Sequence, residues 1–381
     1  MPEPLLIFAL LIAVFVGFNI GGSTTAPAFG PAVGASLVPK VVAGGLMAVF
    51  FGLGAATIGR RVVDTLGQQV LHDSSLFTLE SSIVILGLIG LALFAGNRTG
   101  VPASTSMTTV GAIAGLGVAS GELQWATMRE IVFWWVVAPI AGFAVSVAIG
   151  YFSYQRIADW ISESSSNEPL FALDQSGTIP SITVTSSQRD ELLAGGVVVA
   201  VGCLMAFSSG TSNIANIVAP LIGGGVLDMS AGIVLGSAAV ALGALTIARR
   251  TIETLGNEIV ELPLPAALVA STVSGVIITT LSLLGIPASF VIVATVSIAG
   301  LGWSRTLRSD DGSNGRIRAP IGDGGLDPAE ARGAIASKND SSEPELEFDP
   351  FESARVLTLQ HVIPIVSTVG AYAVFSVAPV Y

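Results

Sequence analysis

An internal repeat constrains this chain more than any other feature of its sequence. Residues 53–67 read LGAATIGRRVVDTLG and residues 242–256 read LGALTIARRTIETLG, so the two blocks start 189 residues apart and align without a gap. The same separation places GGSTTAPAFGP (21–31) over GTSNIANIVAP (210–220). A register that holds across two separate blocks predicts two homologous halves built on one plan.

A third pair of blocks supports a division of the chain into segments. GVPASTSMTTVGAIAG (100–115) pairs with GIPASFVIVATVSIAG (285–300) at a separation of 185 residues. We therefore expect two transmembrane repeats joined by a polar loop, then an acidic flexible loop rich in Gly, Ser and Pro, and a C-terminal transmembrane helix. In chain order these five segments are 1–152, 153–190, 191–303, 304–355 and 356–381.

Composition places these repeats in a membrane. A chain of 381 residues that is 51% hydrophobic and 11% charged has too little polar surface for a water-soluble globule. Uncharged stretches near the length of a membrane-spanning helix recur along it, and they predict an all-α polytopic protein of the cell membrane with about 10–12 membrane elements. The net charge of −11 is typical of proteins adapted to high salt, a halophile's pattern.

Several function classes find no support in the sequence. No catalytic motif occurs in a convincing context, so we do not expect an enzyme, and neither polar loop shows a nucleic-acid-binding pattern. The single cysteine, Cys203, rules out an intramolecular disulfide or a cysteine metal site. His72 and His361 lie far apart and lack ligand-like neighbours, so we expect no metal and no cofactor.

Matched glycine and proline interruptions in the two halves are typical of secondary transporters. A broken helix in lipid leaves backbone groups unpaired, which is tolerated only against protein or a hydrated cavity. The N-terminus of a half-helix offers N–H groups and a partial positive charge, which suit an anion. We expect breaks that recur in both halves, at 21–31 and 210–220 and at the hydroxyl run 104–109, with hydroxyl and amide side chains converging on one anion. The candidate ligands are Ser23, Thr24, Thr25, Ser104, Thr105, Ser106, Ser212, Asn213 and Ser289.

These segments resemble the inorganic phosphate transporters usually called PiT. That family's repeated signature reads approximately GANDVANAFGTAVG, and each half later carries a motif close to GxPxSTTHxxxG. GGSTTAPAFGPAVG (21–34) and GTSNIANIVAPLIG (210–223) occupy the first position here, and 100–111 and 285–296 the second. The resemblance implies two inverted repeats, a midplane anion site, alternating access and phosphate transport, with Na⁺ or H⁺ as coupling ion. A homodimer is a further expectation.

This chain departs from the family pattern at its charged positions. The signature aspartate falls on Thr24 and Asn213, so no carboxylate is left to bind a cation or proton. Asn216 retains a family asparagine and is the candidate cation-facing amide, although neutral oxygens bind Na⁺ more weakly than carboxylates do. Sulfate carries no proton near neutral pH and suits a site made of donors. We expect phosphate first and sulfate as the alternative; a non-transporting sensor and a passive anion channel stay open.

An arginine pair in each half allows two interpretations. Arg60 and Arg61 are followed by Asp64, and Arg249 and Arg250 are followed by Glu253 in the equivalent run ARRTIE (248–253). An acid three or four residues further along a helix fits a local ion pair at the membrane boundary. The alternative is that the arginines attract the anion toward its pathway.

Overall fold

The described part of the chain is almost entirely helical. The computed structural model describes residues 3–99, 104–164, 171–174, 181–184, 189–246, 263–312, 350–378 and 380–381. The helices of the first half are α1 (Glu3–Gly34), α2 (Lys40–Gly54), α3 (Arg60–Asp64), α4 (Leu79–Thr99), α5 (Thr105–Ser120) and α6 (Trp125–Phe152). Two π-helical turns, η1 (Ala55–Gly59) and η2 (Thr65–Gln69), flank α3, and a 3₁₀ turn, η3 (Ser74–Leu76), precedes α4. The later helices are α7 (Tyr154–Ser164), α8 (Arg189–Gly223), α9 (Met229–Thr246), α11 (Leu264–Leu283), α12 (Phe290–Gly312) and α14 (Pro350–Val377).

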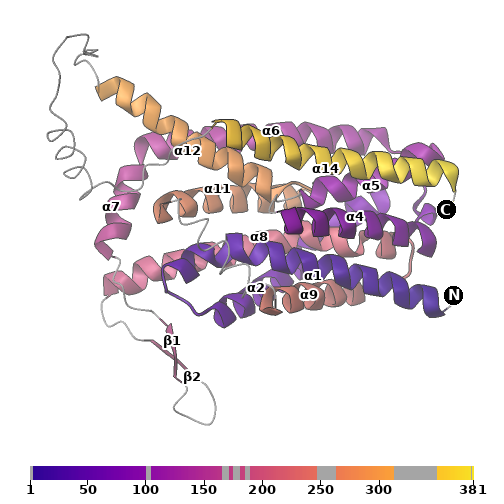
Figure 1. Ribbon diagram of the computed structural model, residues 1–381, viewed down its shortest axis with the longest axis horizontal. Coiled ribbons are helices and arrows are strands. Elements are labelled where there is room, and N and C mark those ends of the chain that lie inside the picture. The colour runs from indigo at the N-terminus through magenta and orange to yellow at the C-terminus, as the bar shows by residue number, and fades with distance from the viewer. Residues whose placement is uncertain are drawn as a thin grey trace, which may run out of the picture.

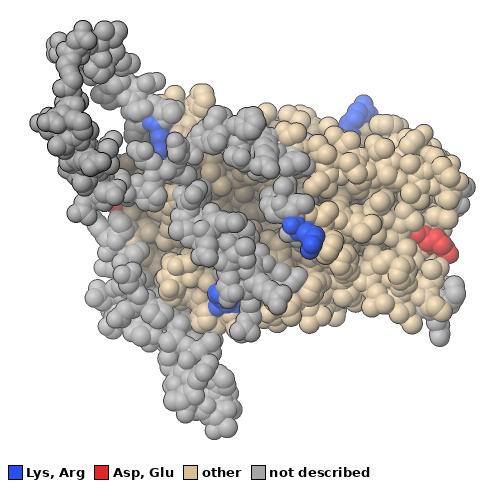
Figure 2. Space-filling model, viewed as in Figure 1, with Lys and Arg blue, Asp and Glu red and all other residues tan. Residues whose placement is uncertain are grey.

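Most of these helices are membrane elements. Seven stretches among the described residues are long and apolar enough to cross a membrane, and α5 and the apolar parts of α12 and α14 are shorter. These elements confirm the prediction of an all-α polytopic membrane protein. The helices run roughly along one common direction, and both termini lie at the same end (Figure 1). Figure 2 shows a described surface that is largely free of charged side chains along the helices.

Three described elements fall in the segments predicted as loops. Helix α7 and an antiparallel hairpin, β1 (Phe171–Asp174) with β2 (Ser181–Val184), lie within 153–190. The hairpin pairs Phe171 with Val184 and projects beyond the end of the bundle (Figure 1). Helix α12 continues to Gly312 and α14 begins at Pro350, so both extend into the segment 304–355. Residues 313–349 lie outside the described part.

The predicted helix breaks at 21–31 and 210–220 are wrong. Helix α1 runs unbroken through Pro27 and Pro31, and α8 runs unbroken through Pro220. Glycine and proline destabilise helices in water. In hydrocarbon, however, a broken helix exposes N–H and C=O groups that no water can bind, so a continuous helix that contains a proline is lower in free energy than a broken one. The hydroxyls of Thr24 and Thr25 donate to helix carbonyls one turn earlier, at 2.7 and 2.6 Å.

Helix breaks do occur at the third pair of sequence blocks, which includes the predicted break at the hydroxyl run 104–109. Helix α5 begins at Thr105 after α4 ends at Thr99, and α12 begins at Phe290 after α11 ends at Leu283. Each half therefore contains one helix that starts inside the bundle. Ser104 accepts from the Met107 N–H at 3.3 Å. The matching cap in the second half is Ser289 with the Ile292 N–H, at 3.4 Å. The predicted half-helices thus exist at these positions.

The 189-residue repeat is also a symmetry of the packing. A Cβ added to Gly21 would overlap the Val240 carbonyl oxygen, and one added to Gly210 would overlap the Phe51 carbonyl oxygen. Shifting each residue of the first contact by 189 positions, in opposite senses, gives the second contact. The same exchange relates two further close contacts, Gly54 with the Phe207 carbonyl and Gly243 with the Phe18 carbonyl. Each half therefore packs glycines against carbonyl groups of the other half, and the contacts made by one half are repeated at equivalent positions by the other. We call these contacts the glycine–carbonyl crossings.

Equivalent helices of the two halves run antiparallel. Gly17, near the middle of α1, approaches Ile217 late in α8, whereas Phe29, late in α1, approaches Gly202 early in α8. Figure 1 shows the same relation, with α1 leaving the end at which α8 finishes. Opposite directions for equivalent helices are what the predicted inverted repeats require.

The C-terminal helix takes part in the same symmetry. Gly300 of α12 approaches the Phe143 carbonyl of α6, and Gly115 of α5 approaches the Thr368 carbonyl of α14. The pairs α6 with α12 and α5 with α14 have the most extensive helix contacts among the described elements. Because α5 and α12 are repeat-equivalent, α14 is the counterpart of α6. Among the described elements, the helix predicted as an addition to two repeats therefore completes the second half.

Candidate functional site

The first turn of α5 meets the middle of α8 at the centre of the bundle. Thr105 Oγ1 donates to Asn213 Oδ1 at 2.5 Å, and the hydroxyls of Ser106 and Ser212 lie 3.2 Å apart. Ser106, Ser212 and Asn213 are buried and Thr105 is half-buried. These bonds join the two halves, since α5 belongs to the first and α8 to the second. We call Thr105, Ser106, Ser212 and Asn213 the junction.

The turn before α12 contacts the junction from the second half. Ser212 Oγ donates to the Ala288 carbonyl at 3.0 Å. Ser289, next in the chain, is buried and caps α12. The first turns of α5 and α12 both carry backbone N–H groups without helix partners, as every helix N-terminus does. Two helix starts therefore lie beside the hydroxyls of α8.

The two asparagines of α8 are hydrogen-bonded to each other. Asn213 Oδ1 accepts from Thr105 and also from Asn216 Nδ2, at 3.1 Å. Asn213 Nδ2 donates to Ser209 Oγ at 3.0 Å. Asn216 is fully buried, and its Oδ1 has no hydrogen-bond partner in the described structure. A buried oxygen of this kind is a free acceptor for a cation or a donor group.

The structure brings together most of the predicted ligands. Hydrogen bonds join Thr105, Ser106, Ser212, Asn213 and Asn216 with the Ala288 carbonyl. Ser104 and Ser289 are the chain neighbours of Thr105 and Ala288 and cap the two helix starts. We call these seven residues and the Ala288 carbonyl the connected set. For Ser23, Thr24 and Thr25 the described hydrogen bonds go to carbonyls of their own helix. Their role as ligands stays a prediction.

Three polar residues near the junction were not predicted. Ser209 accepts from Asn213, and Thr211 Oγ1 donates to Ser282 Oγ of α11 at 3.1 Å. Ser209 and Thr211 lie in or beside the GTSN segment, which is a signal that could have found them. Ser282 is one of several Ser and Thr residues in α11, so only the fold distinguishes it from the others.

The connected set is electrically neutral. Its described hydrogen bonds join hydroxyl, amide and backbone groups, with no charged side chain among them. No group of three His, Cys, Asp or Glu side chains that could hold a metal occurs within the described ranges. Helix N-termini and hydroxyl donors are suited to an oxyanion, whose charge they stabilise without a paired cation.

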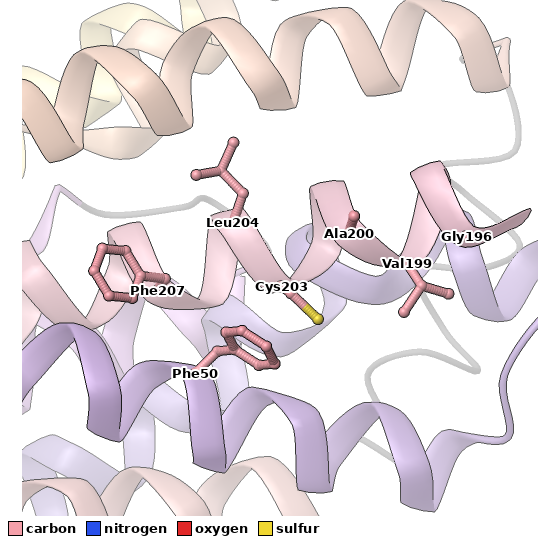
Figure 3. Close-up of a pocket in the computed structure, with 7 residues that line it drawn as sticks. All are labelled: Phe50, Gly196, Val199, Ala200, Cys203, Leu204 and Phe207. Carbon is pink, nitrogen blue, oxygen red and sulfur yellow. The ribbon is translucent and has the colours of Figure 1, made fainter. Parts of the chain in front are cut away.

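An apolar pocket of about 520 Å³ lies apart from these groups, between α2 and α8 (Figure 3). Phe50 on α2 and Cys203 on α8 point into the space between the two helices, whereas Leu204 points away from it. The other lining residues are Gly196, Val199, Ala200 and Phe207. This lining offers no donor suited to an oxyanion, so the pocket is distinct from the junction.

The two halves are equivalent, run antiparallel and meet where helices start inside the membrane bundle. This arrangement defines a class of protein, the polytopic membrane transporters. The particular family follows from comparison with known proteins. Residues 20–320 match the phosphate transporter family, and the chain belongs to that family. It is a multi-pass protein of the cell membrane.

The relatives with similar sequences include both a sulfate permease and a phosphate transporter. The sulfate permease CysP of Bacillus subtilis is 33% identical over 299 residues, which cover 78% of this chain and 77% of that protein. A sodium-dependent phosphate transporter of Toxoplasma gondii is 34% identical over 141 residues, or 35% of this chain and 16% of that one. A solved structure titled as the sodium-dependent phosphate transporter has the same fold, with a TM-score of 0.67, 17% identity and coverage of 98% and 100%.

Proposed function

We propose that this chain is a secondary transporter that moves inorganic phosphate across the cell membrane by alternating access of its two halves. The observation that carries the proposal is the junction, where Thr105 and Ser106 of the first half bond to Asn213 and Ser212 of the second. An anion bound there contacts both halves. Movement of one half against the other then exposes it to either side in turn.

Sulfate is the second candidate, and the neutrality of the junction favours it. Phosphate near neutral pH still carries a proton and needs an acceptor, whereas sulfate needs donors only. The unpartnered Asn216 Oδ1 is an acceptor within the connected set, so a protonated phosphate has a group to receive its hydrogen bond. Family membership and this oxygen keep phosphate ahead, while the neutral donors and the resemblance to a sulfate permease support sulfate.

We infer that Na⁺ is the better of the two expected coupling ions. The connected set holds no carboxylate or histidine that could carry a proton, but it holds the unpartnered Asn216 Oδ1 as well as hydroxyl and carbonyl oxygens. Neutral oxygens are ligands for a hard cation, although they bind it weakly without a carboxylate. Weak coupling is therefore expected, with Asn216 facing the cation.

Uptake into proteoliposomes tests the function. The full chain is reconstituted, and the uptake of radiolabelled phosphate and of radiolabelled sulfate is measured with a Na⁺ gradient, with a pH gradient and with neither. We expect concentrative phosphate uptake that depends on the Na⁺ gradient, with empty liposomes as the control. Concentrative uptake of sulfate alone would assign the second candidate.

Two other results would replace the transporter proposal. Anion flux that only follows its own gradient, at the same rate with and without a coupling gradient, would indicate a passive channel. No flux of either anion under any gradient, from protein shown to be folded, would indicate a sensor or partner subunit that kept the fold.

A further inference from the structure

The turn between α11 and α12 carries two groups of the connected set, the Ala288 carbonyl and Ser289. Its geometry is fixed at the end of α11, where the Ile286 N–H donates to the Leu281 carbonyl at 2.9 Å and the Gly285 N–H donates to the Ser282 carbonyl at 3.0 Å. Gly285 has a φ of +77°, the left-handed conformation that ends many helices. The position of α11 therefore sets the position of Ala288.

Arg61 contacts this helix end from the first half of the chain. Its Nη1 donates to the Leu283 carbonyl at 2.5 Å, and Leu283 is the last residue of α11. The last carbonyls of a helix lack intrahelical partners and carry partial negative charge, so a guanidinium stabilises them. Arg61 thus ties α3 to α11 across 222 positions of sequence.

A second contact from α3 and η2 reaches the same turn. Thr65 Oγ1 donates to the Arg61 carbonyl at 3.1 Å. A Cβ added to Gly285 would lie 2.8 Å from that Thr65 oxygen, so the turn packs directly on this side chain. The segment 61–65 therefore holds the turn at two points, at Leu283 and at Gly285.

The neighbouring arginine makes no such link. Arg60 Nε donates to the Ala56 carbonyl of its own helix at 2.8 Å, and both arginines are exposed. Neither described bond is the ion pair with Asp64 that the sequence suggested. The pair thus separates into one arginine that reaches the second half and one that does not. The equivalent arginines, 249 and 250, lie outside the described residues.

We propose that Arg61 is a positioning residue for the anion site. By holding the C-terminus of α11, it keeps the Ala288 carbonyl within hydrogen-bond distance of Ser212. It also keeps Ser289 in place at the start of α12. It does not touch the anion, and it acts through the turn. This inference rests on the proposed function only in that the site near the turn binds the transported anion.

Transport kinetics give the first test, on the full chain in proteoliposomes. Arg61→Gln is expected to raise the KM for the transported anion about tenfold, as the loss of one charge-assisted hydrogen bond would. Arg61→Lys keeps a cationic donor and should restore most of the affinity. Arg60→Gln is the matched control and should leave KM unchanged. An Arg61→Gln protein with wild-type KM, or one whose defect Arg61→Lys does not relieve, would overturn the proposal.

A second test does not depend on transport. In a Cys203→Ala background, Ser289→Cys gives one thiol beside the turn, and its rate of modification by a water-soluble thiol reagent reports how well the turn is held. Adding Arg61→Gln should speed modification about tenfold through local opening, whereas adding Arg60→Gln should not. Equal rates in all three proteins would overturn the proposal. If wild-type protein carries no anion, the proposed function fails while this measurement still decides the role of Arg61.

Discussion

Neutral side chains stand where the family resemblance places charge. The signature aspartate position is occupied in the second half by Asn213, whose oxygen accepts from Thr105 and Asn216. An amide oxygen with two donors is satisfied without a negative charge, so the site needs no cation to balance it.

Ser212 and Ser23 occupy equivalent repeat positions but have different partners. Ser212 bonds to Ala288 and Ser106, whereas Ser23 Oγ donates to the Ile20 carbonyl at 3.2 Å. Ser212→Ala should raise the KM for uptake about tenfold, the effect of one lost buried hydrogen bond. Ser23→Ala should raise it less. Equal effects of the two substitutions would show that both serines contact the anion.

Restoring a carboxylate at Asn213 should change the choice of anion. In Asn213→Asp the new negative charge repels sulfate, while a protonated phosphate can donate a hydrogen bond to it. The ratio of the KM for sulfate to the KM for phosphate should rise about tenfold, a change of about 1.4 kcal/mol in relative binding. Asn213→Gln, which keeps the amide, is the control. If Asn213→Asp left this ratio of KM values unchanged, position 213 would not distinguish a protonated anion from an unprotonated one.

At the scale of elements, the repeat predicted the symmetry and the break before α5, whereas the breaks predicted at 21–31 and 210–220 were wrong. Sequence alone identified the polar segments and paired them correctly, because each pair of blocks aligns without a gap at a separation of 189 or 185 residues. Prolines 27, 31 and 220 were misleading, since inside a membrane bundle a helix keeps its backbone bonds and accepts the proline. The sequence could not predict the partners of Arg61 and Thr211, because both contacts join helices that lie far apart in the chain.

The glycine–carbonyl crossings hold the two halves together, and Gly21 tests them. A methyl group in Gly21→Ala would overlap the Val240 carbonyl and push α1 away from α9. We expect a loss of about 1–3 kcal/mol in the free energy of unfolding, as overpacked cores show, measured as a lower thermal midpoint in detergent. Gly30→Ala in the same helix meets no atom within 4 Å and should be neutral or slightly stabilising. An unchanged thermal midpoint in Gly21→Ala would contradict the close contact between Gly21 and the Val240 carbonyl.

At the scale of the whole molecule, two antiparallel halves enclose one set of neutral donors. Helix α5 and the turn before α12 approach α8 from the two halves, so the site exists only where the halves meet. A site shared between two moving bodies is the arrangement that alternating access requires. The transport proposal therefore depends on an anion binding at this junction and nowhere else along the bundle.

Anion protection of a thiol at Thr105 tests that dependence most directly. Thr105 is half-buried, and Cys203→Ala removes the chain's single native thiol, so Thr105→Cys in that background reports on the junction alone. The measured quantity is its rate of modification by a water-soluble thiol reagent in the presence of phosphate, of sulfate or of chloride. We predict that phosphate or sulfate slows modification in a concentration-dependent way and that chloride does not. Identical rates in all three salts would contradict an oxyanion site at the junction.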